Sequence, residues 1–139
     1  MMAGIKSYKD LIAWQKAMDL VEAVYKLSAL FPTDERFGLT AQIRKAAVST
    51  PSNIAEGYSR RSRSDYVHFL DIALGSANEV ETQALVAIRL RFVTRAQAQP
   101  VLELAPEVQR IPGGLISRLE GSDRKDVRGH RASPPPKPP

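Results

Sequence analysis

Cysteine is absent from the 139 residues of this chain, and histidine occurs only as His68 and His130. A chain without cysteine cannot form a disulfide framework, a Cys-ligated zinc finger or a thiol nucleophile, and it suits a reducing cytoplasm. Two histidines are too few for a His-rich metal site. The longest aliphatic run in a helical segment, residues 85–88, is far shorter than the ~20 residues that a membrane helix requires. We therefore expect a cytoplasmic protein with no membrane association, no metal and no cofactor.

Motifs of catalysis are also missing. The chain has no Gly-rich phosphate loop, no nucleophile elbow and no Glu-x-x-His pair of the kind that di-iron bundles use. Asn53 and Glu56 lie one helical turn apart, but acid chemistry there would need a second carboxylate or a histidine, which the local sequence does not offer. We expect a protein that is not an enzyme.

The chain does contain helical periodicity over the length of a single domain. Ser7 followed by Asp10 resembles a capping box, which predicts a helix that starts there and ends at Phe31, before Pro32. Its apolar stripe consists of Leu11, Trp14, Met18, Val21 and Tyr25, widened by Val24, Leu27 and Phe31. The stripe is expected to face the core, with a subunit contact as the alternative for Trp14. No segment alternates apolar and polar residues for long, so the sequence favours an all-α fold.

A second helix is predicted from Leu39 onward, with Pro51 inside it. An interior proline removes one backbone donor, so we expect a kink at Pro51. Asn53 and Glu56 are expected to bond backbone groups that Pro51 leaves unpaired and to cap the helix end, and Gly57 is expected to be a left-handed C-terminal cap. Pro51, Asn53, Glu56 and Gly57 thus form a predicted structural motif.

Ser62 followed by Asp65 repeats the Ser-to-Asp start and predicts a third helix, and Thr94 is a candidate cap for a fourth. The third helix has the clearest apolar face, formed by Tyr66, Phe69, Leu70, Ala73, Ala77, Val80, Ala84 and Ile88. Prolines at positions 100, 106 and 112 interrupt the fourth helix, and each costs ~3 kcal/mol against alanine inside a helix. We therefore expect helix 4 to be broken into two or three short pieces, or to be partly frayed. Residues 121–139 lack apolar periodicity and predict a disordered, basic, Pro-rich tail after a bundle domain of residues 1–120.

An antiparallel up-and-down bundle brings the start of helix 1, the helix 2–3 turn and the end of helix 4 to one end. That end would collect Lys6, Lys9, Arg60, Arg61, Arg63 and Arg118. Clustered cations suit contact with nucleic-acid phosphates, and Tyr58 and Tyr66 could stack on unpaired bases. Alternatively, the arginines only keep the turn soluble and the tyrosines pack against their neighbours.

Several runs in the first two thirds of the chain carry a resemblance to a known family. They are residues 8–11, 14–18, 31–32, 35–40, 42–47, 51–57 (PSNIAEG), 61, 69–70 and 72–76. These runs resemble the four-helix-bundle family named for 23S rRNA intervening sequences. The resemblance is strong over about residues 5–87, weakens over 88–120, where Pro106 and Pro112 depart from the family's uninterrupted fourth helix, and vanishes in the tail.

The resemblance implies an antiparallel four-helix bundle, often assembled as a homopentamer. It also implies a fold similar to the accessory variability protein of diversity-generating retroelements, which contacts reverse transcriptase and nucleic acid. We therefore expect a non-enzymatic oligomer that binds RNA or DNA through its basic end. The alternative is a protein-interaction scaffold that recruits a partner such as a polymerase without touching nucleic acid. A degenerate copy with impaired assembly is a third possibility.

Overall fold

A computed structural model of the chain describes residues 4–129, apart from the side chains of Pro112 and of residues 117–129. These residues form four α-helices and two short 3₁₀ helices, with no strand in the described part. The elements in chain order are η1 (Tyr8–Asp10), α1 (Ile12–Ser28), η2 (Thr33–Glu35), α2 (Leu39–Tyr58), α3 (Arg63–Arg89) and α4 (Arg95–Gly129).

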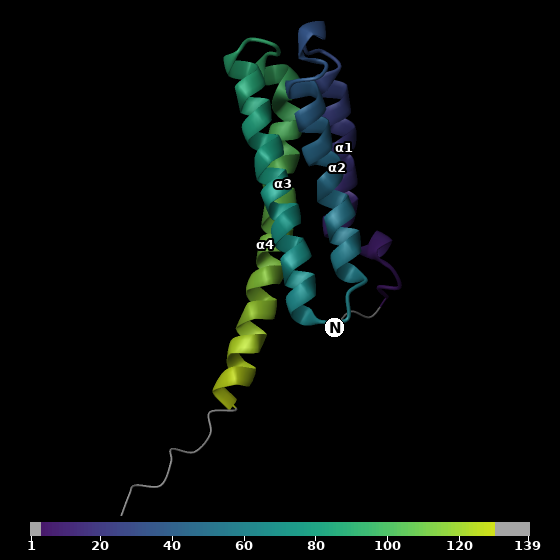
Figure 1. The fold of residues 1–139 in the computed structure, drawn as a ribbon, viewed down its shortest axis with the longest axis vertical. Helices are drawn as coiled ribbons and strands as arrows, with labels where there is room; N and C mark the ends of the chain where they lie inside the picture. The colour runs from purple at the N-terminus through teal and green to yellow at the C-terminus, as the bar shows by residue number, and fades with distance from the viewer. Residues whose placement is uncertain (1–3, 130–139) are drawn as a thin grey trace, which may run out of the picture.

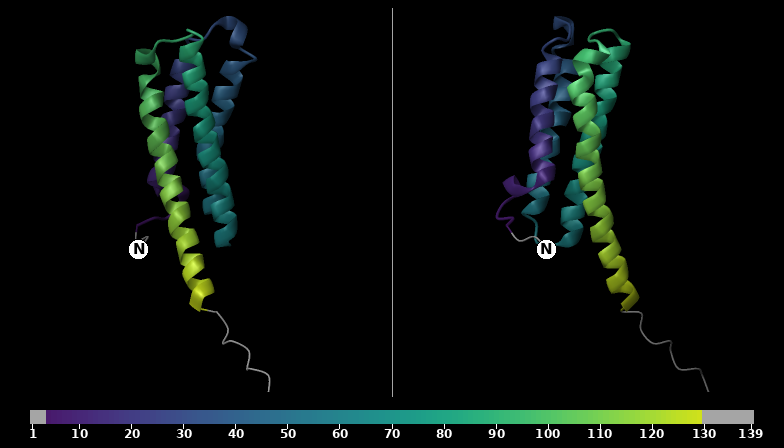
Figure 2. Two further views of the ribbon diagram at one scale, coloured as in Figure 1. Left: turned by 90° about the vertical axis from the view of Figure 1, so that its left-hand side faces the viewer. Right: turned by 180° about the vertical axis from the view of Figure 1, so that it is seen from behind.

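The helices run alternately up and down, and each packs against two others (Figures 1 and 2). The packed pairs are α1 with α2, α2 with α3, α3 with α4, and α4 with α1, so the four helices close around one core. The C-terminal turns of α4 extend past the α2–α3 turn (Figure 1). This arrangement confirms the all-α, antiparallel four-helix bundle that the sequence predicts. No helix in the described range is both long and apolar enough to cross a bilayer.

The first predicted helix is divided in the structure. Ser7 and Asp10 do form a reciprocal capping box, but it caps the 3₁₀ turn η1, after which Leu11 is extended and α1 begins at Ile12. α1 ends at Ser28, three residues before Phe31. The predicted start at Ser7 is therefore correct, but the continuous helix is shorter at both ends than predicted.

The core face of α1 is rotated from the predicted stripe. Leu11, Val24, Leu27 and Phe31 of the predicted stripe are buried as expected, whereas Met18 and Tyr25 are each 43% exposed. Ala13, Ala17 and Leu20, which the prediction did not include, complete the buried face. Two neighbouring stripes of α1 are apolar, and periodicity alone does not decide which one faces the other helices. The small alanines face inward because they let the helices approach closely, which leaves the stripe of larger side chains at the surface.

The interior combines a few branched side chains with many alanines. The largest fully buried side chains are Leu20, Val24, Ile43, Ile54, Leu70, Val80, Val101 and Val108. Fully buried alanines on all four helices lie between them: Ala17, Ala47, Ala73, Ala77, Ala84, Ala87, Ala98 and Ala105. Each buried valine or leucine stabilises the fold by about 1.5–3 kcal/mol relative to an exposed position.

α4 is one continuous helix, so the prediction that prolines break it into pieces is wrong. Pro100 and Pro106 occupy exposed positions, while Ala98, Val101, Ala105 and Val108 are buried against the bundle. Burial of this face along α1 and α3 offsets the low helix propensity, since tertiary packing commonly overrides propensity. α4 continues to Gly129, past the predicted domain boundary at residue 120. Residues 130–139 lie outside the described range, and the disordered tail stays a prediction.

Candidate nucleic-acid interface

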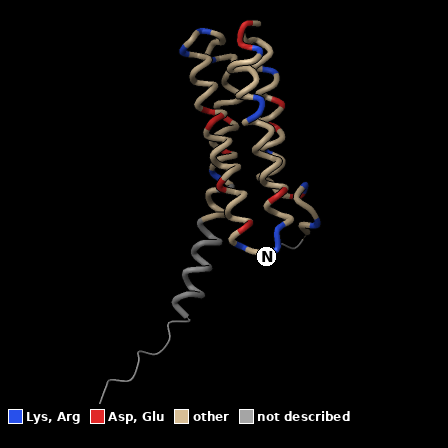
Figure 3. Tube along the Cα trace, viewed as in Figure 1, with Lys and Arg blue, Asp and Glu red and all other residues tan. Residues whose placement is uncertain are grey.

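The structure places five of the six predicted cations at one end of the bundle. Lys6 lies just before η1 and Lys9 within it, and Arg60, Arg61 and Arg63 lie in and just after the α2–α3 turn. Figure 3 shows Lys and Arg positions at this turn and in the N-terminal segment beside it. All five of these residues are exposed. Arg118 lies farther along α4, in the part whose side chains are outside the described range.

Local hydrogen bonds fix the α2–α3 turn and therefore the arginines on it. The Arg60 backbone N–H donates to the Gly57 carbonyl at 3.1 Å, and the Ser59 hydroxyl donates to the Glu56 carbonyl at 2.8 Å. Ser62 then caps α3, because its side-chain oxygen accepts from the Asp65 N–H at 3.1 Å. A capped helix start directly after four connecting residues leaves the turn little freedom.

The N-terminal cations are fixed in a similar way. One Asp10 carboxylate oxygen accepts from the Lys6 N–H at 2.8 Å and from the Ser7 N–H at 3.2 Å. The Lys9 N–H donates to the Ser7 hydroxyl at 3.1 Å. η1 packs against α1 and α2, so Lys9 within it and Lys6 just before it lie at the same end of the bundle as the turn arginines.

The arginines of the turn have different surroundings. Arg60 forms an ion pair with Glu56, and its guanidinium lies 4.8 Å from the centre of the Phe69 ring. Phe69 belongs to α3, so Arg60 ties the end of α2 to the neighbouring helix as well as contributing charge. Arg61 and Arg63 are exposed on the solvent side of the turn. All three arginines are exposed, and because Arg60 also has this structural role, Lys6, Lys9, Arg61 and Arg63 are taken as the candidate phosphate contacts of this end.

The two tyrosines near the arginines pack into the bundle. Tyr58 and Tyr66 are partly buried against the core and meet edge to face with ring centres 6.5 Å apart. The Tyr66 hydroxyl is buried and has no hydrogen-bond partner among the described residues. Burial raises the pKa of the Tyr66 phenol above its ordinary value, and the neighbouring Tyr58 raises it further. These contacts favour the packing role over base stacking.

Gly57 has a role that differs from the predicted one. It lies inside α2 rather than in a left-handed cap, and the helix ends one residue later, at Tyr58. A Cβ at position 57 would lie 2.8 Å from the Phe69 Cβ and 3.0 Å from the Tyr66 Cδ2. Glycine is therefore required because α3 passes directly over this point of α2. The predicted left-handed cap is wrong.

The other motif residues form hydrogen bonds around Pro51, through which α2 runs without interruption. Proline at 51 deprives the Ala47 carbonyl of its helical donor. The Asn53 amide does not bond that carbonyl as predicted, because its Nδ2 donates to the Ser49 carbonyl at 2.8 Å and to the Ser49 hydroxyl at 2.9 Å. The Ser49 hydroxyl also lies 2.9 Å from that of Ser76 on α3. Asn53 thus supports an α2–α3 contact, while the side chain of Glu56 pairs with Arg60.

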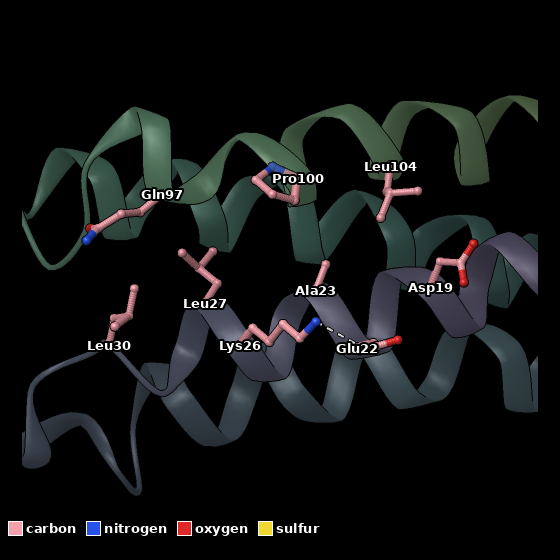
Figure 4. A pocket seen from close by; sticks show the side chains of 9 residues that line it. All are labelled: Asp19, Glu22, Ala23, Lys26, Leu27, Leu30, Gln97, Pro100 and Leu104. Atoms are coloured by element: carbon pink, nitrogen blue, oxygen red, sulfur yellow. Dashed lines mark ion pairs between the residues drawn. The ribbon is translucent and has the colours of Figure 1, made fainter.

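A groove between α1 and α4 offers a cavity of about 560 Å³ that is unrelated to the basic end (Figure 4). Ala23, Leu27 and Leu104 contribute apolar side chains to its lining, and the Lys26–Glu22 ion pair at 3.2 Å lies on the α1 side. Its lining includes neither histidine nor serine. Within the described residues, no group of three or more His, Asp or Glu side chains could hold a metal ion.

Comparison with protein families matches residues 9–114 to the 23S rRNA-intervening sequence protein family. The chain belongs to this family. Among solved structures, it is similar to a protein of unknown function from the S23 ribosomal protein family of Bacteroides thetaiotaomicron. The two share 25% sequence identity with a TM-score of 0.70, over 76% of this chain and 98% of that one. Comparison with curated proteins gave no match.

This member of the family has a second group of exposed arginines, which the sequence reasoning missed. Arg89, Arg91 and Arg95 lie around the α3–α4 turn, at the end of the bundle opposite the α2–α3 turn. In the sequence, three arginines within the seven residues 89–95 (RLRFVTR) indicate this group. The same up-and-down topology that gathers cations at the α2–α3 turn also gathers these three at the opposite end.

Proposed function

We propose that this protein is a non-enzymatic, oligomeric nucleic-acid-binding protein of the cytoplasm whose basic end contacts the phosphates of RNA or DNA. The observation that carries the proposal is the exposed set of Lys6, Lys9, Arg61 and Arg63 at one end of the bundle. The family's name refers to an insertion in ribosomal RNA, which makes RNA the first ligand to test.

The physical basis is the release of counterions from the nucleic acid. Each phosphate that a lysine or arginine neutralises releases condensed cations, so affinity falls as salt rises. The side chains at this end are long, cationic and exposed, and the neighbouring tyrosines are packed into the bundle. Binding should therefore depend weakly on base sequence, because phosphate contacts carry no sequence information.

Replacing Arg60, Arg61 and Arg63 together by alanine tests the site. We expect weaker binding of labelled RNA in fluorescence anisotropy, with the salt slope of log affinity reduced by about 1.4 for single strands, since Arg61 and Arg63 belong to the contact set and each phosphate contributes about 0.7. The control removes the same charge from the sides of the bundle, by Lys16→Ala, Lys45→Ala and Arg110→Ala. Circular dichroism verifies that both variants keep the helical fold. Unchanged affinity in the first variant, or equal losses in both, would show that this end is not the binding site.

Arg60→Ala alone, compared with Arg61→Ala, distinguishes the loss of a positive charge from the loss of a structural contact. Because Arg60 contacts both Glu56 and Phe69, we expect this single change to lower stability as well as affinity. Arg61→Ala should lower affinity while the unfolding midpoint stays unchanged.

Self-association is supported by the surface stripe of α1. A groove of about 400 Å³ between α1 and α2 is lined mainly by apolar side chains, among them Trp14, Met18, Val21 and Val48. We propose that a second copy of the chain covers this groove, and the family resemblance suggests a pentamer. Met18→Glu should reduce the mass measured by light scattering, whereas Ile72→Glu on α3 should not. A wild-type chain that is monomeric at micromolar concentration would refute self-association.

The same groove favours a second candidate function, a scaffold that recruits a protein partner such as a polymerase. The two functions are separated by pulldown from nuclease-treated extract. Stoichiometric recovery of one partner protein that Met18→Glu abolishes and the turn variant retains would favour the scaffold.

A further inference from the structure

The α3–α4 turn holds an arginine where a glycine is expected. Arg91 has a φ of 62°, and among the residues that the structure describes no other residue except glycine has a positive φ. It follows the C-cap of α3, where the Phe92 N–H donates to the Ala87 carbonyl at 2.9 Å and the Arg91 N–H donates to the Ile88 carbonyl at 3.0 Å. Helices commonly end in such a left-handed residue, and that residue is usually glycine because a Cβ is disfavoured there. An arginine at this position points to a use for its side chain.

Two more arginines flank the turn and line a hollow beside it. Arg89 and Arg95 contribute to a cavity of about 480 Å³, whose other lining residues are Thr82, Leu85, Val86 and Ile88. Leu85 and Val86 are partly exposed there. A cavity of this size lies within the range that holds a small ligand. The guanidinium groups can bind the phosphate of an unpaired nucleotide, and the apolar lining beside them can contact the face of its base.

An exposed aromatic residue lies on the other connection at this end of the bundle. Phe31, which precedes η2, contacts Phe92 of the α3–α4 turn with ring centres 6.2 Å apart, so the two connections are held together. Phe37, just beyond η2, is 88% exposed, and the Arg36 guanidinium lies 5.3 Å from its ring centre. An exposed ring backed by an arginine is a surface on which a base can stack.

We infer that this end is a second contact surface for single-stranded nucleic acid, formed by Arg89, Arg91 and Arg95 with Phe37. The inference rests on the proposed function for the class of ligand and goes beyond it in giving each chain two sites. α3 has 27 residues and separates the two sites by about 40 Å at 1.5 Å per residue. A bundle with a site at each end can hold two strands apart or join them.

Titration of the full chain with a labelled six-nucleotide RNA, in low salt and well above the dissociation constant, tests the inference by stoichiometry. The wild type should bind two oligonucleotides per chain. Arg89→Ala/Arg91→Gly/Arg95→Ala should bind one, Arg60→Ala/Arg61→Ala/Arg63→Ala should also bind one, and the combined variant should bind none. Lys16→Ala/Lys45→Ala/Arg110→Ala, which removes an equal charge from the sides, should still bind two.

Each outcome bears on one of the two sites. If the Arg89/Arg91/Arg95 variant keeps the wild-type stoichiometry, the second surface is refuted and the first site stands. If only the Arg60/Arg61/Arg63 variant keeps it, the first site fails and the second stands. Arg91→Gly alone should weaken binding several-fold while raising the melting temperature, which separates loss of contact from loss of fold.

The same end could instead meet an anionic membrane, because Leu30, Leu90 and Phe37 are exposed there. Sedimentation with vesicles of phosphatidylserine and phosphatidylcholine tests this alternative. We expect no protein in the pellet at physiological salt. Vesicle binding that Arg89→Ala/Arg91→Gly/Arg95→Ala abolishes, together with unchanged RNA stoichiometry in that variant, would overturn the inference in favour of a lipid surface.

Discussion

Gly57→Ala tests how the basic end is built, because this glycine lies where α2 and α3 are closest. An added Cβ would be 2.8 Å from the Phe69 Cβ and 3.3 Å from the Tyr66 carbonyl oxygen. The first atom is the fixed base of a side chain and the second is backbone, so neither can move aside without shifting α3. The substitution should therefore push the two helices apart at the arginine turn.

The expected magnitude follows from two opposing effects. Overpacking of this kind costs about 1–3 kcal/mol. Replacing a helical glycine by alanine otherwise stabilises by about 0.5–1 kcal/mol. The midpoints of these two ranges, about 2 and about 0.75 kcal/mol, leave a net loss of about 1 kcal/mol in the free energy of unfolding.

Gly75→Ala is the matched control, since Gly75 is exposed on α3 and a Cβ there meets nothing within 4 Å. This variant should gain about 0.5–1 kcal/mol from helix propensity alone. Urea unfolding followed by circular dichroism, with all proteins at one concentration, measures both changes. The close-packing argument is refuted if Gly57→Ala unfolds at the same or a higher urea concentration than the wild type.

Two further predictions concern Tyr66 and Arg91. The phenol pKa of Tyr66 is raised above 10.0 in the folded protein, so the unfolded chain loses the phenol proton at a lower pH than the folded chain does. The neutral phenol therefore contributes fully to stability below pH 10.0, and this contribution is lost as the pH rises through the folded-state pKa. Tyr66→Phe should reduce this alkaline loss in a series of urea titrations and, by removing a buried unpaired hydroxyl, raise stability at pH 7 by about 1 kcal/mol; a loss at pH 7 would show that the hydroxyl has a partner. Arg91→Gly should raise stability by about 1 kcal/mol, because an L-residue in the left-handed region costs roughly 1–2 kcal/mol; a lower melting temperature would refute the claim of strain.

Much of the fold could be predicted because local signals agree with packing. Ser62 caps α3 as expected, and Thr94 caps α4 by accepting from the Gln97 N–H at 3.1 Å. The side-chain pattern of the third helix also predicted its buried face, including Leu70, Ala73 and Val80. Helix caps and the spacing of apolar residues depend on a few neighbouring residues, so they can be predicted from the sequence.

The errors arose where a distant part of the chain decides the outcome. Gly57 after a helical run has the same local signature whether it ends the helix or lets another helix approach, and only the position of α3 distinguishes the two. Prolines 100 and 106 have low helix propensity, but their exposed positions and the buried face of α4 cannot be known before the bundle is assembled. The rotated core of α1 has the same cause.

The candidate site was predicted in part for the same reason. Topology alone brings Lys6 and Lys9 to the end that holds Arg61 and Arg63, and the structure has this arrangement. The contacts of Arg60 with Glu56 and Phe69 depend on side-chain geometry across two helices, as does the inward packing of Tyr58 and Tyr66. The left-handed backbone of Arg91 has no signature in the sequence, because glycine is the residue that would normally mark it.

The central claim, that the protein binds nucleic acid through exposed cations, is tested most directly by fluorescence anisotropy across a salt series. Labelled RNA and DNA hairpins and single strands are titrated with the wild-type protein. The account predicts binding at low salt whose log affinity falls linearly with log salt, with a slope of about −3 for single strands if four phosphates are contacted at one end. Absence of binding at low salt, or an affinity that salt does not change, would contradict it.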